Sequence, residues 1–323
     1  MQNKAAVGSS LVVVLGTGGT IAGTAASASD NVGYNAAQLG ASQLVTAISA
    51  PGSTPIEVEQ VAQVDSKDMG FAIWRELVVA VDRHLARSEV CGIVITHGTD
   101  TLEETAYFLQ RVLAPAKPVV LVAAMRPATS LQADGPQNLL DALLVARTPG
   151  ARGVVAMLAG AVHSALDVRK LHPYRLDAFG SGDAGALAHI EAGQVRRHRE
   201  WPACEALGLA RLPRDVADWP VVEIVTSHSE ARGTLVRALC EAGVDGIVAA
   251  ASGNGGLHHA LQTALLEAQA AGVAVLRSTR CLNGSVIEPP DERAARPLPS
   301  AGALTPVQAR IELMLRLLVR RAA

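Results

Sequence analysis

The sequence predicts an α/β fold, with a larger N-terminal domain built on a mostly parallel sheet flanked by helices and a smaller C-terminal α/β domain. Two observations carry this prediction: short apolar, β-branched segments alternate with helical patterns, and 323 residues exceed what one core usually holds. Segments that are apolar at nearly every position are typical of parallel strands covered on both faces. We expect strands at 11–15, 91–96, 118–124, 153–158, 221–226, 246–251 and 273–277.

Helical patterns separate these segments. Apolar residues at helical spacing predict helices around 74–85 and 102–113. A last helix is expected to begin with Thr305 as its N-cap and Pro306 in its first turn, since both residue types are favoured at those positions.

One stretch interrupts the alternation. Residues 199–218 contain Pro202 and Pro213, mixed charges and little periodicity. We interpret this stretch as a linker between a larger N-terminal domain, residues 1–198, and a smaller C-terminal domain, residues 219–323.

Composition narrows the possible partners and the compartment. The net charge of −2 gives no electrostatic reason to expect nucleic acid or an anionic membrane as a partner. The apolar stretch at 11–15 is too short for a membrane span or a secretory signal. The four cysteines form no C-x-x-C pair, so neither a zinc site nor a disulfide framework is indicated. With Met1 interpreted as a start residue, we expect a cytoplasmic protein.

Polar or glycine-rich loops follow four of the expected strands, at 16–23, 97–101, 125–127 and 252–256. Open parallel sheets bind ligands beyond the carboxyl ends of their strands, so these loops are the candidate site. The first loop has neither the P-loop nor the dinucleotide-binding spacing. Taken alone, it leaves nucleotide binding and other functions equally open, and Thr20 can be interpreted as a helix cap.

The second loop carries more chemistry. Thr99 and Asp100 place a hydroxyl beside a carboxylate, a plausible site pair, whereas Thr101 and Glu104 fit a capping box. His97 is a candidate general base, although a hydrogen-bonded structural role is the favoured interpretation. Neither H-E-x-x-H nor G-x-S-x-G occurs, which disfavours zinc proteases and nucleophile-elbow hydrolases.

Several motifs, in order along the whole chain, resemble those of the bacterial L-asparaginase family, in its type II branch. The resembling segments are Gly18-Gly19-Thr20-Ile21-Ala22-Gly23, Thr96-His97-Gly98-Thr99-Asp100-Thr101, Ala124-Met125-Arg126-Pro127, Asp167-Val168-Arg169-Lys170, Gly253-Asn254-Gly255 and Arg277-Ser278-Thr279-Arg280.

The resemblance implies a role for each matching residue of the reaction site. Thr20 matches the family's nucleophile, and Tyr34, in a loop rich in small residues, matches the tyrosine that helps to activate it. Thr99, Asp100 and Lys170 match the second threonine and its proton-relay partners. A threonine hydroxyl is a weak nucleophile and needs such a partner.

The resemblance also implies substrate-binding positions. Ser66 and Asp100 match residues that hold the α-carboxylate and α-amino groups, with Asp65, Lys67 and Gly98 beside them. The backbone carbonyl of Ala124 matches one that faces the scissile amide. The resemblance further implies a homotetramer with active sites between subunits. A neighbouring subunit would contribute to each site Asn254 and one of Glu288, Asp291 and Glu292.

The implied function is hydrolysis of L-asparagine to L-aspartate and ammonia through a threonine acyl-enzyme, with minor glutaminase activity, and without cofactor or metal.

Lys67 departs from the family, which commonly has Gln or Glu there, and its charge repels a substrate ammonium unless a nearby carboxylate pairs with it. Some exported relatives form a disulfide near Cys91, but no second cysteine follows near Pro118, which fits a cytoplasmic location.

Two alternatives stay open. One is a non-catalytic protein that binds an amino acid or a nucleotide through the same loops. The other is an amidotransferase-type amidase subunit that acts on charged tRNA. It is disfavoured because the first strand begins by residue 11 and no basic patch occurs.

Overall fold

A computed structural model describes residues 11–48, 55–289 and 297–321. The chain forms two compact units that divide between Leu209 and Ala210, and each unit has its own sheet. The first part of the expected linker belongs to the N-terminal unit, because Trp201 is buried in that unit's core. The boundaries at 198 and 219 stay a prediction.

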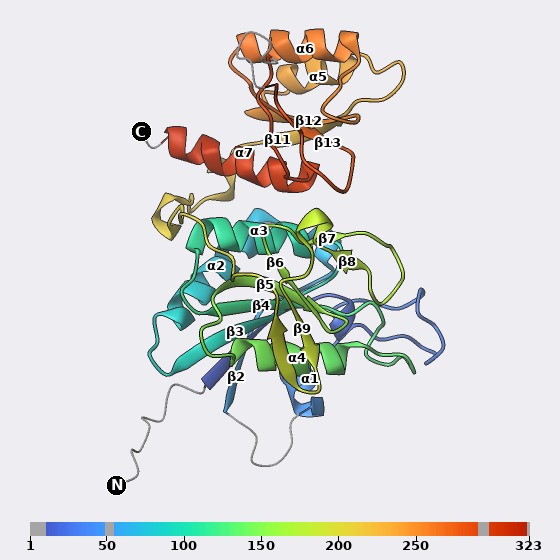
Figure 1. Ribbon diagram of the computed structural model, residues 1–323, viewed down its shortest axis with the longest axis vertical. Coiled ribbons are helices and arrows are strands. Elements are labelled where there is room, and N and C mark those ends of the chain that lie inside the picture. The colour runs from blue at the N-terminus through green and yellow to red at the C-terminus, as the bar shows by residue number, and fades with distance from the viewer. Residues whose placement is uncertain (1–10, 49–54, 290–296, 322–323) are drawn as a thin grey trace. The chain divides into compact units, whose positions relative to one another are not determined.

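The N-terminal unit is built on a mixed sheet with the strand order β10-β9-β6-β5-β4-β3-β1-β2 (Figure 1). Its parallel strands are β1 (Leu11–Gly18), β2 (Ile56–Val64), β3 (Val90–Thr96), β4 (Pro118–Val122) and β5 (Gly153–Leu158). Antiparallel strands extend the sheet beyond β5: β6 (Ala161–Ser164), β9 (Ala188–Glu191) and β10 (Gln194–Arg197). The expected mostly parallel sheet is confirmed.

The sequence analysis missed β2. This strand lies at the sheet edge and pairs with β1 alone. Its sequence, IEVEQVAQV, mixes charged and apolar residues, and none of its residues is fully buried. A search for continuous apolar segments finds strands covered on both faces and overlooks an edge strand of this kind.

Helices cover both faces of the sheet (Figure 1). One face carries α1 (Ala41–Ile48) and α4 (Gly135–Ala146), and the other carries α2 (Phe71–Leu85) and α3 (Leu102–Leu113). The helices expected around 74–85 and 102–113 are therefore confirmed. Short elements complete the unit: β7 (Arg169–Lys170), β8 (Phe179–Gly180), and the 3₁₀ turns η1 (Thr20–Ala22), η2 (Ser66–Asp68) and η3 (Gly182–Ala184). A further turn, η4 (Leu209–Arg211), spans the boundary between the units.

Aliphatic side chains make up most of this core, since aromatic residues are only 3% of the chain. The four residues from Val12 to Leu15 are fully buried. Burying one such side chain stabilises the fold by about 1.5–3 kcal/mol. A rare aromatic pair, Trp74 stacked on Phe108 at 4.8 Å between ring centroids, joins α2 to α3.

The C-terminal unit is smaller and has a parallel sheet of order β11-β12-β13. Helices α5 (Thr234–Glu241) and α6 (His259–Ala270) pack together on one face, and α7 (Pro306–Arg321) covers the other (Figure 1). The strands are β11 (Val222–Thr226), β12 (Gly246–Ala251) and β13 (Ala274–Thr279), with η5 (Val216–Asp218) before them.

The predicted start of the last helix is confirmed. Thr305 Oγ1 accepts the backbone N–H of Gln308, and Gln308 Oε1 accepts the N–H of Thr305. This reciprocal pair satisfies two donors at the start of α7.

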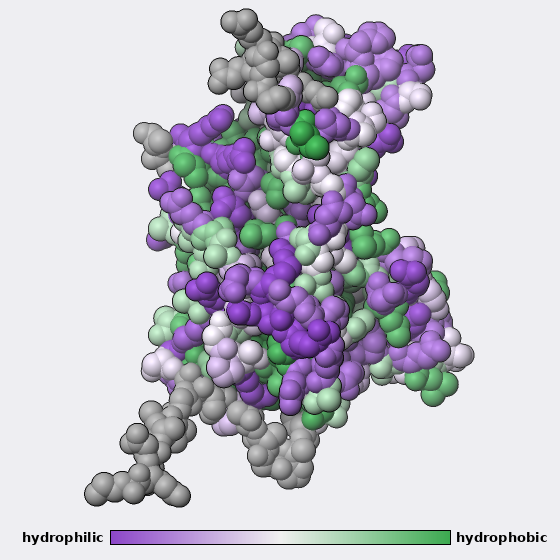
Figure 2. Space-filling view, viewed as in Figure 1, coloured by the Kyte–Doolittle hydropathy of each residue, from purple (hydrophilic) through white to green (hydrophobic). Residues whose placement is uncertain are grey.

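The surface has an ordinary distribution of residue types. On the face shown in Figure 2, hydrophobic residues are interspersed among hydrophilic ones, and scattered apolar residues of this kind are normal on protein surfaces. Across the described ranges, no helix combines the length and the apolar character needed to cross a membrane.

Candidate active site

The strand order places a ligand crevice at the carboxyl ends of β1 and β3. The parallel strands have the order 2-1-3-4-5, in which the chain reverses direction across the sheet between β1 and β3. The loop after β1 carries Thr20, and the loop after β3 carries Thr99 and Asp100. The topology therefore brings both loops to the point where open parallel sheets bind their ligands.

Two glycines allow these loops to touch. A Cβ atom on Gly19 would lie 2.3 Å from the Cα atom of Gly98, and Gly19 also has a φ of +81°. A Cβ atom on Gly98 would lie 2.4 Å from Ser66 Oγ. Glycine is thus required at both positions, for the close approach and, at Gly19, for the left-handed backbone.

The Thr20 hydroxyl lies at the start of η1 and is almost buried. It shares a hydrogen bond of 2.8 Å with the hydroxyl of Tyr34. Tyr34 reaches it from the loop after η1, whose ends are joined by backbone hydrogen bonds between Thr24 and Asn35. The structure thus pairs the predicted nucleophile with its predicted activator.

A second group forms around Lys170, which lies on β7. Its Nζ donates to Thr99 Oγ1 at 2.9 Å and to Asp100 Oδ1 at 2.6 Å. Lys170 and Thr99 are mostly shielded from solvent, whereas Asp100 is half exposed. The ammonium is thus held by an anion and a hydroxyl, an arrangement suited to proton transfer through Thr99.

Both groups line one cavity of about 220 Å³, formed in part by Thr20, Tyr34, Thr99, Asp100 and Lys170. Five further residues complete the lining, and the sequence analysis assigned none of them to the site: Asn31, Val32, Met125, Pro173 and Tyr174. Their loop positions gave no local signal of a shared cavity.

Ser66 lies behind Asp100 and is fully buried. Its Oγ accepts the backbone N–H of Asp100 at 3.1 Å. The cavity lining does not include Ser66, Asp65 or Lys67, although the structure describes all three. Ser66 thus fixes the backbone of Asp100.

The Lys67 ammonium pairs with Asp65 at 2.5 Å and with Asp68 at 3.5 Å. The Lys67 side chain is 62% exposed, and both carboxylates raise the pKa of its ammonium, chiefly through the hydrogen bond that Lys67 donates to Asp65. A neighbouring carboxylate thus compensates the Lys67 charge, which is the condition that the sequence set.

The capping-box interpretation of Thr101 and Glu104 is wrong. Thr101 occupies the N-cap of α3, but its side chain makes no cap hydrogen bond. Its Oγ1 donates instead to the backbone carbonyl of Ser66 at 2.8 Å. This non-local acceptor ties the loop after β3 to η2, which the local sequence did not reveal.

His97 is a structural residue, as the favoured interpretation predicted. It is fully buried, and its Nδ1 lies 2.7 Å from the carbonyl oxygen of Gly98. Burial lowers the pKa of His97 to about 4, so its ring is neutral at pH 7 and Nδ1 is the protonated nitrogen that donates. His97 does not line the cavity.

Glu103 is a partly buried carboxyl behind the Lys170 group. Its Oε1 accepts the backbone N–H of Lys170 at 3.4 Å. Burial raises the pKa of Glu103 to about 7, against the lowering effect of that hydrogen bond. The sequence analysis gave Glu103 no role of its own.

Ala124 and Gly98 occupy the expected loops. Ala124 is fully buried after β4, and Asp134 fixes the chain just beyond it by accepting the N–H groups of Met125 and Arg126 at 2.9–3.1 Å. The role of the Ala124 carbonyl toward a substrate stays a prediction.

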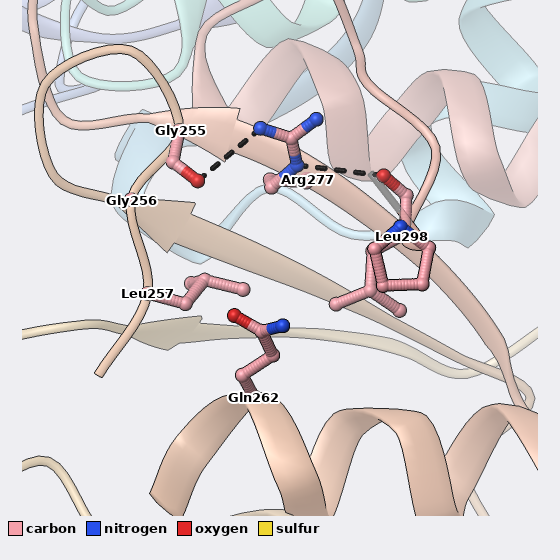
Figure 3. Close-up of a pocket in the computed structure, with 7 residues that line it drawn as sticks. Gly255, Gly256, Leu257, Gln262, Arg277 and Leu298 are labelled. Carbon is pink, nitrogen blue, oxygen red and sulfur yellow. Dashed lines mark hydrogen bonds between the residues drawn. The ribbon is translucent and has the colours of Figure 1, made fainter. Parts of the chain in front are cut away.

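The C-terminal unit carries Asn254 and Glu288. Asn254 exchanges two hydrogen bonds with the backbone of Ile287, and Glu288 forms an ion pair of 2.5 Å with Arg277. Arg277 is almost fully buried and also donates to the carbonyls of Gly255 and Leu298, beside a cavity of about 270 Å³ (Figure 3). Asp291 and Glu292 lie outside the described residues.

No cluster of three or more His, Cys, Asp or Glu side chains suited to a metal occurs within 11–48, 55–289 and 297–321. His258 instead caps α6, where its side chain accepts the N–H of Ala260.

Known proteins match both units of the chain. Residues 11–203 match the family described as Asparaginase, N-terminal, and residues 221–321 match the Glutaminase/Asparaginase C-terminal domain. L-asparaginase 2 of Escherichia coli is 36% identical over 95% of this chain and 88% of its own length. Glutaminase-asparaginase of Pseudomonas fluorescens is 35% identical over 95% of this chain and 86% of its own length.

A solved structure is also similar. The crystal structure of a probable cytoplasmic L-asparaginase from Campylobacter jejuni has a TM-score of 0.87 and 37% identity, and it covers 95% of each chain. Together, the fold and the matches over both units define an amidohydrolase. The chain belongs to the asparaginase family.

Proposed function

We propose that this protein hydrolyses L-asparagine to L-aspartate and ammonia through an acyl-enzyme on Thr20, with minor activity on L-glutamine. One observation carries the proposal: the Thr20–Tyr34 pair and the Thr99–Asp100–Lys170 group line a single cavity. The relatives named L-asparaginase and glutaminase-asparaginase support both substrates.

In the first step, Thr20 Oγ1 attacks the carbon of the side-chain amide. Tyr34, 2.8 Å from that hydroxyl, relays the proton: its oxygen accepts the Thr20 proton as its own phenolic proton passes to the amide nitrogen. The C–N bond then breaks, and the proton leaves with the amine as ammonia. The product of this step is an aspartyl ester of Thr20.

In the second step, water hydrolyses the ester. Thr99 Oγ1 accepts a proton from the attacking water as its own proton passes to Lys170 Nζ, 2.9 Å away, and Lys170 in turn gives a proton to the Asp100 carboxylate at 2.6 Å. The proton returns to Thr20 as the ester C–O bond breaks, so the enzyme is regenerated and aspartate leaves. Asp100 serves both the relay and the substrate's α-ammonium.

The decisive experiment compares Thr20→Ala with Thr20→Ser. We expect the wild type to release ammonia from L-asparagine, Thr20→Ser to keep measurable activity, and Thr20→Ala to lose it. Full activity in a folded Thr20→Ala variant would remove Thr20 as the nucleophile. Calorimetric binding without any ammonia release by the wild type would instead support the non-catalytic alternative.

We further propose a homotetramer in which Asn254 of one subunit completes the site of another. Support comes from the family match over both units. Mixing subunits of the inactive variants Thr20→Ala and Asn254→Ala tests this proposal, because sites that combine an intact Thr20 with an intact Asn254 regain activity. No recovery in mixed oligomers of confirmed composition contradicts it.

A cytoplasmic location is the last part of the proposal. It is supported by the similar cytoplasmic enzyme and by the four cysteines, all of which have free thiols. Cell fractionation with compartment markers tests it, and recovery of the enzyme with a periplasmic marker contradicts it.

A further inference from the structure

The cavity lining divides into groups that react and groups that only bound the space. The reacting side chains are those of the Thr20–Tyr34 pair and the Lys170 group. The remaining lining residues decide which substrates fit, since they take no part in the chemistry: Asn31, Val32, Met125, Pro173 and Tyr174.

Only some of these five residues can set a fixed upper limit on the length of a substrate. Val32 is 77% exposed on its loop, and Met125 has a flexible, unbranched side chain. Tyr174 has the largest side chain of the five, and its ring is rigid. A side chain that selects substrates by length must be both bulky and fixed in position, so Tyr174 qualifies only if its neighbours hold it in place.

Arg126 holds Tyr174 by two contacts. Its Nη1 donates to the Tyr174 carbonyl at 2.7 Å, and its guanidinium carbon lies 4.0 Å from the centroid of the Tyr174 ring. Arg126 is buried, with only 6% of the residue exposed, and Nη1 also donates to the Met125 carbonyl. A buried, planar guanidinium that stacks on a ring fixes the orientation of that ring.

The backbone of Tyr174 is held as well. His172 Nδ1 accepts the N–H groups of Tyr174 and Arg175, each at 3.0 Å. The tyrosine is thus fixed through its N–H group, its carbonyl group and its ring, although 46% of it is exposed.

We propose that Tyr174 is a specificity-determining wall that limits the length of the side-chain amide, and that Arg126 is the positioning residue that fixes it. The proposal rests on the proposed amidohydrolase function. With the ring in place, the cavity of about 220 Å³ favours asparagine over glutamine, which is one methylene longer. A difference of one methylene at a fixed wall changes discrimination by about 10- to 200-fold.

The test measures kcat/KM for L-asparagine and for L-glutamine. Tyr174→Ala is expected to raise the glutamine-to-asparagine ratio by about tenfold or more, and Tyr174→Phe, which keeps the ring, is expected to restore the wild-type ratio. Leu176→Ala is the matched control, since Leu176 is a partly exposed residue of the same loop that does not line the cavity. An unchanged ratio in a folded Tyr174→Ala variant overturns the inference.

Arg126 is tested through Tyr174. Arg126→Lys keeps the charge but loses the planar stack, so it is expected to shift the ratio in the same direction and to add nothing to Tyr174→Ala. Full additivity of the two shifts overturns the positioning role. If the wild type releases ammonia from neither amide, the proposed function fails together with this inference, whereas an active wild type with an unmoved ratio overturns the inference alone.

Discussion

The Cα atom of Gly98 lies 2.3 Å from the point that a Cβ atom on Gly19 would occupy. Two glycines, from the loops after β1 and β3, thus form the contact that places Thr20 and Thr99 along one cavity. The site depends on this backbone contact as much as on its reactive side chains.

Gly19→Ala is expected to destabilise the protein by about 3 kcal/mol or more, because it adds a strained φ to an overlap with backbone atoms that have little room to move. Denaturant unfolding and activity measure the effect. Gly70→Ala is the control, since a Cβ atom there would meet nothing within 4 Å. Equal stability of the two variants contradicts the contact.

Lys170→Met is expected to lower kcat by about 10²- to 10⁴-fold, the usual contribution of a positioned proton-transfer group. Thr99→Val should cause a similar loss, and the double variant little more, because Lys170 and Thr99 act as one unit. Steady-state kinetics of the three variants measure this.

Lys117→Met is the matched lysine control for that series. Lys117 donates to the carbonyls of Leu85 and Arg87, at the end of α2, and its loss affects stability rather than kcat. Independent, fully additive effects of Lys170→Met and Thr99→Val contradict a relay.

The Lys67 charge is expected to matter only when its main carboxylate partner, Asp65, is removed. Asp65→Asn leaves the ammonium only the longer contact with Asp68 and should raise KM for L-asparagine by about two- to fivefold, the size of a screened repulsion between like charges. Asn at position 65 can still accept the N–H of Lys67, so the local turn is kept. Asp65→Asn combined with Lys67→Gln should return KM to near the wild-type value, and a double variant as weak as Asp65→Asn rules out the charge effect.

Glu103 gives the protein a pH-dependent stability. Because burial raises the folded-state pKa of Glu103 from 4.5 to about 7, the folded protein binds the proton more tightly than the unfolded chain does. The favourable contribution is therefore complete below pH 4.5 and is lost as the pH rises through 7. The loss amounts to about 3 kcal/mol.

Glu103→Gln stays neutral, so it should reduce the loss of unfolding free energy between pH 5 and pH 8. Urea unfolding at both pH values measures this, with the exposed Glu76→Gln as the control. An identical pH dependence of Glu103→Gln and the wild type contradicts the raised pKa.

Local patterns predicted the features that local physics controls. Strands such as 153–158 are apolar throughout because both of their faces are covered, so composition alone located them. The start of α7 was equally predictable from the sequence, since Thr305 and Gln308 exchange hydrogen bonds within one turn. The edge strand β2 and the true partner of Thr101 escaped because neighbours distant in sequence define both.

By itself, the sequence determined the α/β class and the loops at the strand ends, and through family motifs it predicted the site residues Thr20, Tyr34, Thr99, Asp100 and Lys170. The tertiary structure alone decided that Lys170 contacts Thr99, 71 positions away in the chain, and that Asp65 pairs with Lys67. It also decided that Tyr174 lines the cavity and that Arg126 stacks on its ring. The reason is physical: a residue type fixes what a side chain can donate or accept, whereas the sheet topology and the close backbone approach at Gly19 fix which side chains meet.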